Sequence, residues 1–487
     1  MALPIPPARD LLALWPETLV TATACGALVA DIVTPRDRKR LIGWGCFVAV
    51  CVTLFLLLVM PPQGGSLLAG MFMADGYSAF FKSLFLISTA LTVLISLRYL
   101  DDEGSHYGEY YALLLFAAVG MMFMAGGGDL ITIYLGLELM SLPTYVLVGF
   151  IRRDVVSTEG AVKYYLMGAF TSGILLYGLA LLYGLTGTTN LIAVAEKIAG
   201  LSLDDPALLL ATILVVTGFG FKIAAVPFHM WVPDAYEGAP TSITAFMSAA
   251  VKAAAFAGLT RVFVIAQAPA ALRWEVLWWV LAALSMILGN VVAVAQTSLK
   301  RMLAYSSISH AGYALIGVVS TATAHARGPG VAGVLFYLFA YVFTTMGTFS
   351  MIILLTRQGF RGDHIADFAG LGRTHPLPAF IFIVFFLSLA GIPPTAGFVG
   401  KLLIFRAAID AGFVWLAVIG VATSAIAAYY YFMVIKTMYM DEPTGAVALS
   451  SSRPLSVGLA IMVVATILLG LFPNLVLQAT EVTRIVQ

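Results

Sequence analysis

Four ionisable residues lie in stretches of this 487-residue sequence that are otherwise apolar. They are Glu138 in ITIYLGLELMSLPTYVLVGF, Lys222 in GFGFKIAAVPFHMW, Lys252 in TSITAFMSAAVKAAAFAGL and Lys401 in SLAGIPPTAGFVGKLLIF. A charge inside a membrane helix costs a few kcal/mol unless it is paired, hydrated or neutral. Ionisable residues at that depth therefore usually lie on ion or proton pathways. These four residues therefore indicate proton transfer, in which each group takes up and releases a proton in turn.

Two of the lysines stand beside prolines, with Pro227 following Lys222 and a pair of prolines preceding Lys401. Proline interrupts a membrane helix, and the break frees backbone carbonyls and admits water, which makes a charged lysine affordable. Burial disfavours the charged form of a lysine, whereas a nearby carboxylate favours it. We therefore expect Glu138 and Lys222 to form a pair that exchanges a proton near neutral pH. The alternative is a lysine whose ammonium group reaches the membrane surface.

Lys252 lies roughly 16 Å along its predicted helix, too deep to reach the surface easily. The small residues around it predict close packing against protein. His229 and His310 could relay protons, because imidazole titrates near neutrality, but a structural hydrogen bond explains each equally well. Glu17, in LWPETLV, is expected to face lipid headgroups or a partner subunit rather than a proton path.

The composition predicts a membrane protein of the all-α polytopic class. Hydrophobic residues make up 61% of the chain and charged residues 10%, with a mean hydropathy of +0.98. Soluble domains carry about 25% charged residues. Apolar stretches of about 20 residues each predict about 14 transmembrane helices in one bundle, of which the seventh and twelfth are broken by proline. The N-terminal stretch is expected to be a retained first helix rather than a cleaved signal.

Basic residues predict how the bundle is oriented. Clusters such as Arg36 to Arg40, Lys300 with Arg301, and Arg357 with Arg361 all fall on one side if the predicted helices alternate. Lysine and arginine are enriched in cytoplasmic loops. Both termini are therefore expected on the outer, periplasmic side of a bacterial inner membrane.

Several other chemistries are excluded by the motifs. Cys25, Cys46 and Cys51 have no spacing typical of an iron-sulfur or zinc site. No glycine-rich phosphate-binding motif follows a predicted strand, and the formal charge of +1 provides no basic face for nucleic acid. We therefore expect this chain to bind no metal or cofactor itself.

Two short stretches suggest an internal duplication: YVLVG at 145–149 and YALIG at 313–317 end the fifth and tenth predicted helices. The interruptions near residues 227 and 393 are also five helices apart. Transporters built from repeats place their sites at such broken helices. The predicted division is 1–105 for three N-terminal helices, 106–266 and 273–440 for the two repeats, and 441–487 for the last loop and helix.

One long motif, FKIAAVPFHMWVPDAYEGAPT, is similar to the broken seventh helix of the antiporter-like subunits of respiratory complex I. That family is shared with multisubunit cation/proton antiporters and membrane-bound hydrogenases. The resemblance covers nearly the whole chain and includes LWPETLV, GLELMSLPTYVLVGF and AVKYYLMGAFTSGILLYG. Within the family the chain looks most like the subunit N type of bacterial NADH:quinone oxidoreductase, the counterpart of mitochondrial subunit 2. Members of the M type typically have glutamate where Lys401 stands, and the longest type has a C-terminal extension.

The resemblance implies fourteen helices, two inverted five-helix repeats and a hydrated axis of charge at mid-membrane. It also implies that Glu138, Lys222, Lys252 and Lys401 form a proton relay in a subunit that lies beside other antiporter-like subunits. NADH, FMN, iron-sulfur clusters and quinone would bind elsewhere in the assembled complex. The alternatives are a subunit of a cation/proton antiporter or membrane-bound hydrogenase, which works without this electron transfer, and an inert scaffold.

Overall fold

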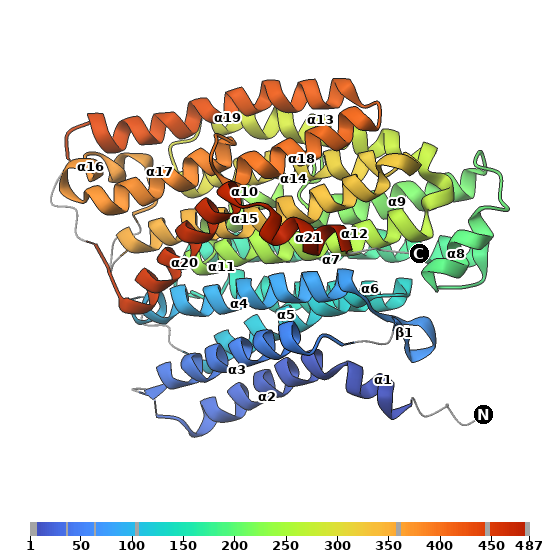
Figure 1. Cartoon of the computed structure of the whole chain (residues 1–487). Coiled ribbons are helices and arrows are strands. Elements are labelled where there is room, and N and C mark those ends of the chain that lie inside the picture. The colour runs from blue at the N-terminus through green and yellow to red at the C-terminus, as the bar shows by residue number, and fades with distance from the viewer. Residues whose placement is uncertain are drawn as a thin grey trace.

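The computed structural model describes residues 7–35, 38–62, 65–102, 107–356, 362–443 and 449–482. Within these ranges the chain is almost entirely helical, and its long helices run side by side in one bundle (Figure 1). Of the basic residues used above to predict the orientation, Arg36, Arg357 and Arg361 lie outside the described residues.

Twelve helices among the described residues are long and apolar enough to cross a membrane. They are α2 (Trp15–Val33), α3 (Arg40–Val59), α4 (Gly76–Asp102), α5 (Gly108–Gly126), α6 (Leu130–Val148), α7 (Val155–Thr186), the continuous run from α11 (Thr241–Phe246) through α12 (Lys252–Arg261) to Ala266, α13 (Ala271–Ala293), α14 (Leu299–Ser320), α15 (Arg327–Leu355), α19 (Val414–Met440) and α20 (Arg453–Leu471). Two shorter apolar helices, α9 (Pro206–Lys222) and α17 (Pro376–Ala390), stand where the sequence predicts broken helices. The predicted all-α polytopic class is confirmed.

The first break separates α9 from the short helix α10 (Trp231–Gly238). α9 ends at Lys222, Ala224 has a positive φ of 65°, and the Val226–Pro227 peptide is cis. Pro227 has no N–H to donate, so the helix cannot continue through it. The ordinary hydrogen-bond ladder is therefore absent next to Lys222.

The second break separates α17 from α18 (Ala396–Asp410). α17 ends at Ala390, Gly391 has a φ of 83°, and the Pro393–Pro394 peptide is cis. A left-handed glycine after the last helical residue is a common way for a helix to end. Lys401 lies in the second turn of the new helix, close to the end of the old one.

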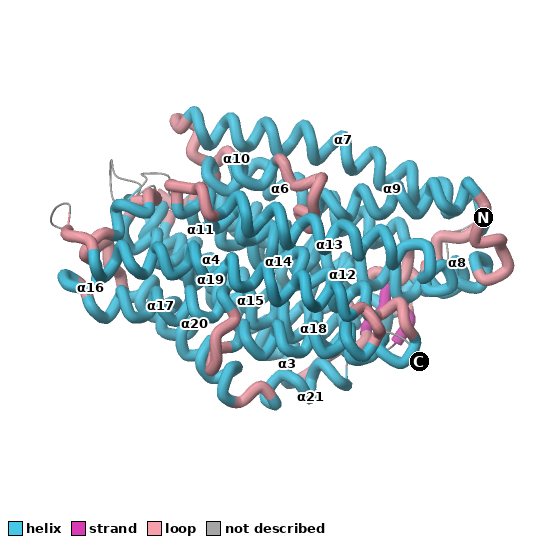
Figure 2. Tube along the Cα trace, turned by 90° about the horizontal axis from the view of Figure 1, so that it is seen from above, coloured by secondary structure: helices cyan, strands magenta, loops and turns pink. Residues whose placement is uncertain are grey.

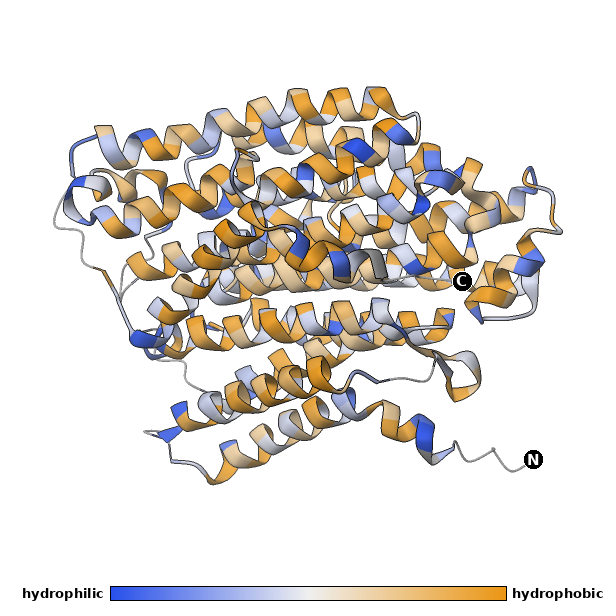
Figure 3. Ribbon diagram, in the orientation of Figure 1, coloured by the Kyte–Doolittle hydropathy of each residue, from blue (hydrophilic) through white to orange (hydrophobic). Residues whose placement is uncertain are grey.

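The bundle has a buried centre and two apolar edges. The run from Thr241 to Ala266 is wholly buried, and α14 and α15 are almost wholly buried. In contrast, α2 and α3 at one edge and α19 at the opposite edge expose most of their surface (Figure 1). Hydrophobic residues cover these outer helices, whereas hydrophilic residues gather at the helix ends and at a few points inside (Figure 3). This distribution is typical of a protein whose outer surface is in contact with lipid.

Short elements close the two ends of the bundle. One end has α8 (Leu191–Ile198) and a hairpin of β1 (Gly65–Leu67) and β2 (Phe72–Ala74), in which Gly65 pairs with Ala74. The opposite end has η7 (Ile365–Phe368) and α16 (Leu371–Thr374). Figures 1 and 2 both show α8 and α16 at opposite ends of the bundle. The remaining short helices are α1 (Ala8–Ala13), α21 (Asn474–Val482), the 3-10 turns η2 (Leu68–Gly70), η5 (Ala268–Ala270) and η6 (Ala324–Ala326), and the π-helices η3 (Met247–Val251) and η4 (Val262–Ala266).

The prediction for Glu17 was wrong. Its side chain is only 2% exposed and lies 2.7 Å from the Nζ of Lys82 on α4, which is 1% exposed. The Lys82 ammonium also lies 4.8 Å from the centre of the Phe72 ring. A buried charge needs an opposite charge close by, and Lys82 supplies it from a helix that the sequence pattern could not pair with α2. Glu17 therefore joins helices inside the chain rather than facing lipid headgroups.

Candidate functional site

Lys222, at the end of α9, points toward one face of α6. Its Nζ donates hydrogen bonds to the Ser141 hydroxyl at 2.7 Å and to the Tyr145 hydroxyl at 3.1 Å. Glu138, Ser141 and Tyr145 share this face, because residues three to four positions apart lie one above the other on a helix. The lysine is 4% exposed, so these hydroxyls replace the water that its ammonium would otherwise bind.

Glu138 does not contact Lys222 directly. No carboxylate oxygen of Glu138 lies within 4.0 Å of the Lys222 Nζ, and its Oε1 is buried without a hydrogen-bond partner among the described residues. Its helix neighbours Leu135 and Leu142 are exposed, so this part of α6 is at the surface of the chain. The Glu138 carboxylate can therefore act on Lys222 through the electric field and through the hydroxyls of α6, rather than through an ion pair in contact.

Lys252 begins α12 immediately after the π-helix Met247–Val251. Its Nζ donates to both the hydroxyl and the backbone carbonyl of Ser307 on α14. Short π-helical turns often occur at functional sites, since the extra residue shifts a side chain around the helix. The π-helical turn thus lies directly before a buried lysine, since Lys252 is only 3% exposed.

His310 lies one helical turn after Ser307 on α14 and is 4% exposed. Its Nδ1 is 2.5 Å from the Tyr337 hydroxyl, and its ring centre is 4.8 Å from that of Tyr341. Ser307 and His310 are on neighbouring positions of one helix face. The structure therefore brings the histidine predicted from sequence to the same row as Lys252.

Lys401 on α18 reaches back to the helix before the break. Its Nζ donates to the carbonyls of Leu389 at 3.2 Å and Ala390 at 2.9 Å, and to the Ser424 hydroxyl on α19 at 3.2 Å. The last carbonyls of a helix have no partner inside the helix and carry its partial negative charge. The ammonium also lies 4.5 Å from the centre of the Tyr313 ring. Lys401 therefore occupies a site made for a cation.

A small cavity connects His310 with Lys401. Its volume is about 10 Å³, and Tyr337 and Ser388 also line it. A cavity of roughly this volume holds about one water molecule if polar groups surround it. One water there could pass a proton between the imidazole and the ammonium group.

His229 is not drawn into this row. It lies in the turn between α9 and α10, half-buried, with its Nδ1 without a hydrogen-bond partner among the described residues. Lys222 donates instead to two hydroxyls of α6. The two histidines predicted from sequence therefore differ, since only His310 is hydrogen-bonded next to a buried lysine.

A charged network joins α7, α10 and α14 at the end of the bundle near α16. Asp234 accepts hydrogen bonds from Lys163 at 2.8 Å and Arg301 at 2.9 Å, and Arg301 also donates to Glu237 at 2.7 Å. Lys300 donates to the backbone carbonyl of Glu237 at 2.8 Å. Asp234 and Glu237 stand in the motif that follows Pro227, so the sequence contained a signal for this network that spacing alone did not resolve.

The hydroxyl partners were the main residues that sequence reasoning missed. Ser141 and Tyr145 could have been found from their helical spacing after Glu138. Ser307, Tyr337 and Ser424 could not, because they approach their lysine or histidine from other helices. Within the described ranges, no group of three or more His, Cys, Asp or Glu side chains is placed to hold a metal ion.

Comparison with known proteins identifies the family. Residues 127–427 match the family model described as NADH:quinone oxidoreductase/Mrp antiporter, transmembrane. The chain is 45% identical to NADH-quinone oxidoreductase subunit N 2 of Rhizobium meliloti over 96% of this chain and 97% of that protein. It is also 42% identical to NADH-quinone oxidoreductase subunit N of Trichlorobacter lovleyi over 97% and 96% of the two chains.

A solved structure agrees with this assignment. A chain of respiratory complex I from Thermus thermophilus matches with a TM-score of 0.81 at 32% identity, over 96% of this chain and 100% of that chain. All elements that carry Glu138 and the three lysines, from α6 to α18, lie inside the matched family region. The chain belongs to the NADH:quinone oxidoreductase/Mrp antiporter family, and within that family to the subunit N relatives.

Proposed function

We propose that this chain is a proton-translocating membrane-arm subunit of NADH:quinone oxidoreductase, respiratory complex I, in a bacterial inner membrane. The chain is 42% and 45% identical to two subunit N relatives over nearly its full length, which supports this function. Other membrane-arm subunits, including further antiporter-like ones, would be its neighbours. NADH, FMN, iron-sulfur clusters and quinone belong to the assembled complex, and in our proposal this chain binds none of them and carries no electrons.

The observation that carries the proposal is a row of buried lysines, each held by hydroxyl or carbonyl oxygens. In the second half of the row, Lys252 donates to Ser307, His310 lies one turn further along the same helix, and His310 and Lys401 line the same small cavity. Buried cations without acidic partners are expensive. A scaffold would gain nothing from them, whereas a proton relay needs groups that can lose and regain a proton.

The relay works through charge rather than through large movements. A buried lysine that gains a proton raises the free energy of the charged form of its neighbours, because charges interact strongly at low dielectric. Protonation of Glu138 would remove the negative charge that favours a charged Lys222 and so promote release of its proton. Proton release would then pass along Lys222, Lys252 and Lys401 in turn. Quinone reduction elsewhere in the complex supplies the free energy.

The row has a gap between Lys222 and Lys252, and aromatic rings lie on its Lys222 side. The Tyr145 hydroxyl accepts a hydrogen bond from Lys222, and the centre of its ring lies 4.6 Å from that of Tyr164. The Tyr164 ring in turn stacks on Trp231, with 4.2 Å between the ring centres. No hydrogen bond among the described residues joins the Lys222 site to the Lys252 site. In our proposal, transfer across this gap passes through water or through the tyrosine hydroxyls.

The orientation and the internal division are part of the proposal. The end of the bundle with Lys39, Arg40, Lys300 and Arg301 would face the cytoplasm, as the positive-inside rule favours, and both termini would face the periplasm. The two interrupted helices would mark equivalent positions in repeats 106–266 and 273–440. Reporter fusions after residues 40 and 300 should then give cytoplasmic signals, and a fusion at the C-terminus a periplasmic signal.

The Glu138→Gln variant tests the relay directly. We expect coupled quinone reduction and proton pumping to fall, while NADH oxidation by an artificial acceptor stays normal because it needs no membrane transport. Glu159→Gln is the matched control, since Glu159 is an exposed glutamate whose carboxylate pairs with Lys163 one turn along α7. Normal pumping by an assembled Glu138→Gln complex would count against the relay.

The alternative function is that of a cation/proton antiporter subunit. A chain of the Mrp complex from Dietzia matches with a TM-score of 0.85, over 97% of both chains, but at 25% identity. The subunit N relatives are far more similar in sequence, which favours complex I. Purification separates the two functions: co-isolation with flavin and iron-sulfur subunits supports complex I, and a flavin-free assembly supports the antiporter.

A further inference from the structure

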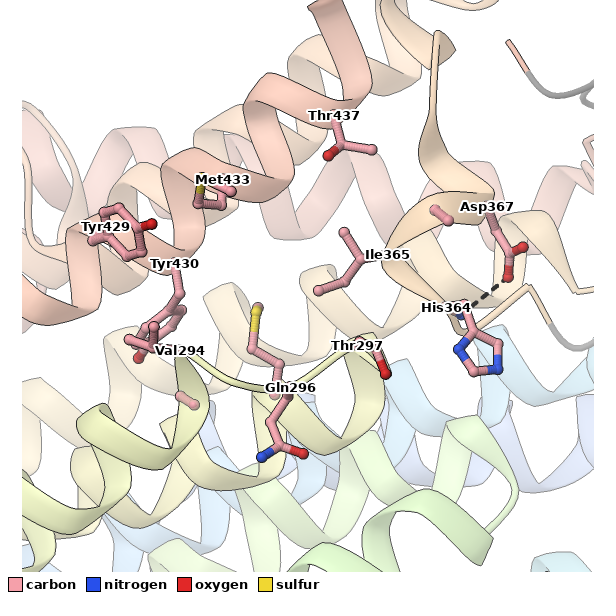
Figure 4. A pocket seen from close by; sticks show the side chains of 13 residues that line it. Val294, Gln296, Thr297, His364, Ile365, Asp367, Tyr429, Tyr430, Met433 and Thr437 are labelled. Carbon is pink, nitrogen blue, oxygen red and sulfur yellow. Dashed lines mark hydrogen bonds between the residues drawn. The ribbon is translucent and has the colours of Figure 1, made fainter. Parts of the chain in front are cut away.

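A pocket of about 530 Å³ enters the second half of the bundle from the end that our orientation places in the cytoplasm. It runs between the end of α13, the end of α19 and η7, and its polar rim includes Gln296, His364 and Asp367 (Figure 4). On α19 its lining extends from Thr437 back to Tyr430, about 10 Å along the helix. The polar rim can hold water, whereas the deeper lining, which includes Met302 and Met433, is mostly apolar.

The innermost wall of the pocket leads to Lys401 through three buried side chains. The Tyr430 hydroxyl donates to the Asn290 Oδ1 at 3.1 Å, and the Asn290 Nδ2 donates to the Tyr313 hydroxyl at 3.2 Å. The Tyr313 ring lies against the Lys401 ammonium, and its hydroxyl is 3.2 Å from that of Thr423, the neighbour of Ser424. Two hydrogen bonds thus join the pocket wall to Tyr313, and the Tyr313 ring is in contact with the last lysine of the row.

The central link in this chain cannot conduct protons. A proton moves along hydrogen bonds only if each group can accept a proton on one side and release one on the other. The amide of Asn290 has a carbonyl that only accepts and an NH₂ that only donates, in either orientation of the group. A serine, a water or a carboxyl group at the same place would complete the connection.

We propose that Asn290 is an insulating residue, which closes the cytoplasmic pocket and prevents proton exchange between that pocket and Lys401. The inference rests on the proposed role of Lys401 in the relay. A pump must not connect one group to both sides of the membrane at once, because protons would then flow back. Asn290 is completely buried and also donates to the Met286 carbonyl of its own helix at 2.7 Å. These bonds hold the amide in place between the two tyrosines.

The purified complex reconstituted in liposomes tests this role without turnover. A pH gradient is imposed, no NADH is added, and its decay is followed with an internal pH dye. Asn290→Asp, which offers a group that can protonate, and Asn290→Ser, which offers a hydroxyl and space for water, should each speed the decay several-fold. Gln296→Glu is the matched control, because Gln296 lines the same pocket but its amide donates only to its own helix, at the Val292 carbonyl. That variant should keep the vesicles tight.

Two further variants separate the insulator from a proton inlet. Tyr430→Phe keeps the ring and removes only the hydroxyl, so it should leave pumping normal; a loss of pumping would make the pocket an inlet and overturn the proposal. Asn290→Asp combined with Lys401→Ala should restore tightness, because the leak passes through Lys401. The proposal would also be overturned if the pH gradient decayed no faster with Asn290→Asp and Asn290→Ser than with the unchanged protein. If Lys401→Ala alone pumps normally, the relay itself has failed.

Discussion

The two broken helices hold their lysines in different ways. Lys222 stands before its break and donates to side-chain hydroxyls of another helix, those of Ser141 and Tyr145. Lys401 stands after its break and donates to backbone carbonyls at the end of the helix that it left, those of Leu389 and Ala390. The first site is thus made by side chains and the second mainly by the path of the backbone. Similar interruptions need not give similar proton sites.

This difference has a functional side. Hydroxyls can donate as well as accept, so the Lys222 site can rearrange when the lysine loses its proton. Carbonyls only accept, and they carry the negative end of the α17 dipole, so the Lys401 site favours the charged lysine. We therefore expect the hydroxyl partners of Lys222 to rearrange when that lysine changes protonation, and the carbonyl partners of Lys401 to stay in place. The following predictions test or refine this comparison.

The largest effect is expected from replacing Lys401 with arginine. Arginine keeps the positive charge that the carbonyls favour but does not release its proton in proteins. Lys401→Arg should therefore pump about as poorly as Lys401→Ala, measured as protons translocated per NADH oxidised in inverted vesicles. Lys436→Arg, at an exposed position near the end of α19, is the control. Near-normal pumping by an assembled Lys401→Arg complex would remove Lys401 from the relay.

A large effect is also expected from Gly391→Ala. Gly391 has a φ of 83°, and a Cβ there would lie 2.7 Å from the Lys401 Cδ. A left-handed conformation costs a non-glycine residue about 1–2 kcal/mol, and the contact would move the lysine from its carbonyls. Pumping should fall while the complex still assembles. Gly412→Ala is the control, because it also has a positive φ but an added Cβ would meet open space.

Loss of a hydroxyl should distinguish the two lysine sites. Ser141→Ala removes one of the two hydroxyl partners of Lys222. The loss of one hydrogen bond costs about 1 kcal/mol, so we expect the pumping rate to fall roughly fivefold. Ser424→Ala leaves Lys401 with both carbonyls, so its effect should be smaller. Steady-state NADH:quinone turnover with and without an uncoupler measures both variants. Equal effects would mean that the backbone does not dominate the Lys401 site.

The smallest effect is expected at Ala224, which has a φ of 65° in the first break. Glycine removes the strain of a left-handed alanine, about 1–2 kcal/mol, but loses part of this gain to its greater freedom when unfolded. Ala224→Gly should therefore raise the thermal stability of the purified complex slightly and leave pumping unchanged. A clear loss of pumping would show that the alanine methyl group itself positions Lys222.

The sequence was sufficient for the positions of the charged row but not for its connections. Glu138 and the three lysines could be predicted because a charge in an apolar stretch is conspicuous, and the breaks because proline interrupts helices. The pairing expected between Glu138 and Lys222 stays a prediction, and the Lys222 ammonium donates to the hydroxyls of Ser141 and Tyr145 on the same face of α6.

The connections depend on which helices meet, and spacing along one chain carries no such information. Ser307 reaches Lys252 from a position 55 residues away, and Tyr337 reaches His310 from the next long helix, 27 residues away. The same limitation explains the error at Glu17, whose partner Lys82 is on another helix. Serine and tyrosine are also common in apolar helices, so neither stands out as an ionisable residue does.

The buried pair of Glu17 and Lys82 has a consequence for how the protein is made. A ribosome synthesises α2 several seconds before α4, at about 5–20 residues per second. During that interval the carboxylate of Glu17, in the first turn of α2, has no lysine to pair with. The burial of this carboxylate should therefore wait until Lys82 is present, or the carboxyl group should stay protonated until then. The Glu17–Lys82 pair would thus make an early step in the assembly of α2 depend on the synthesis of α4.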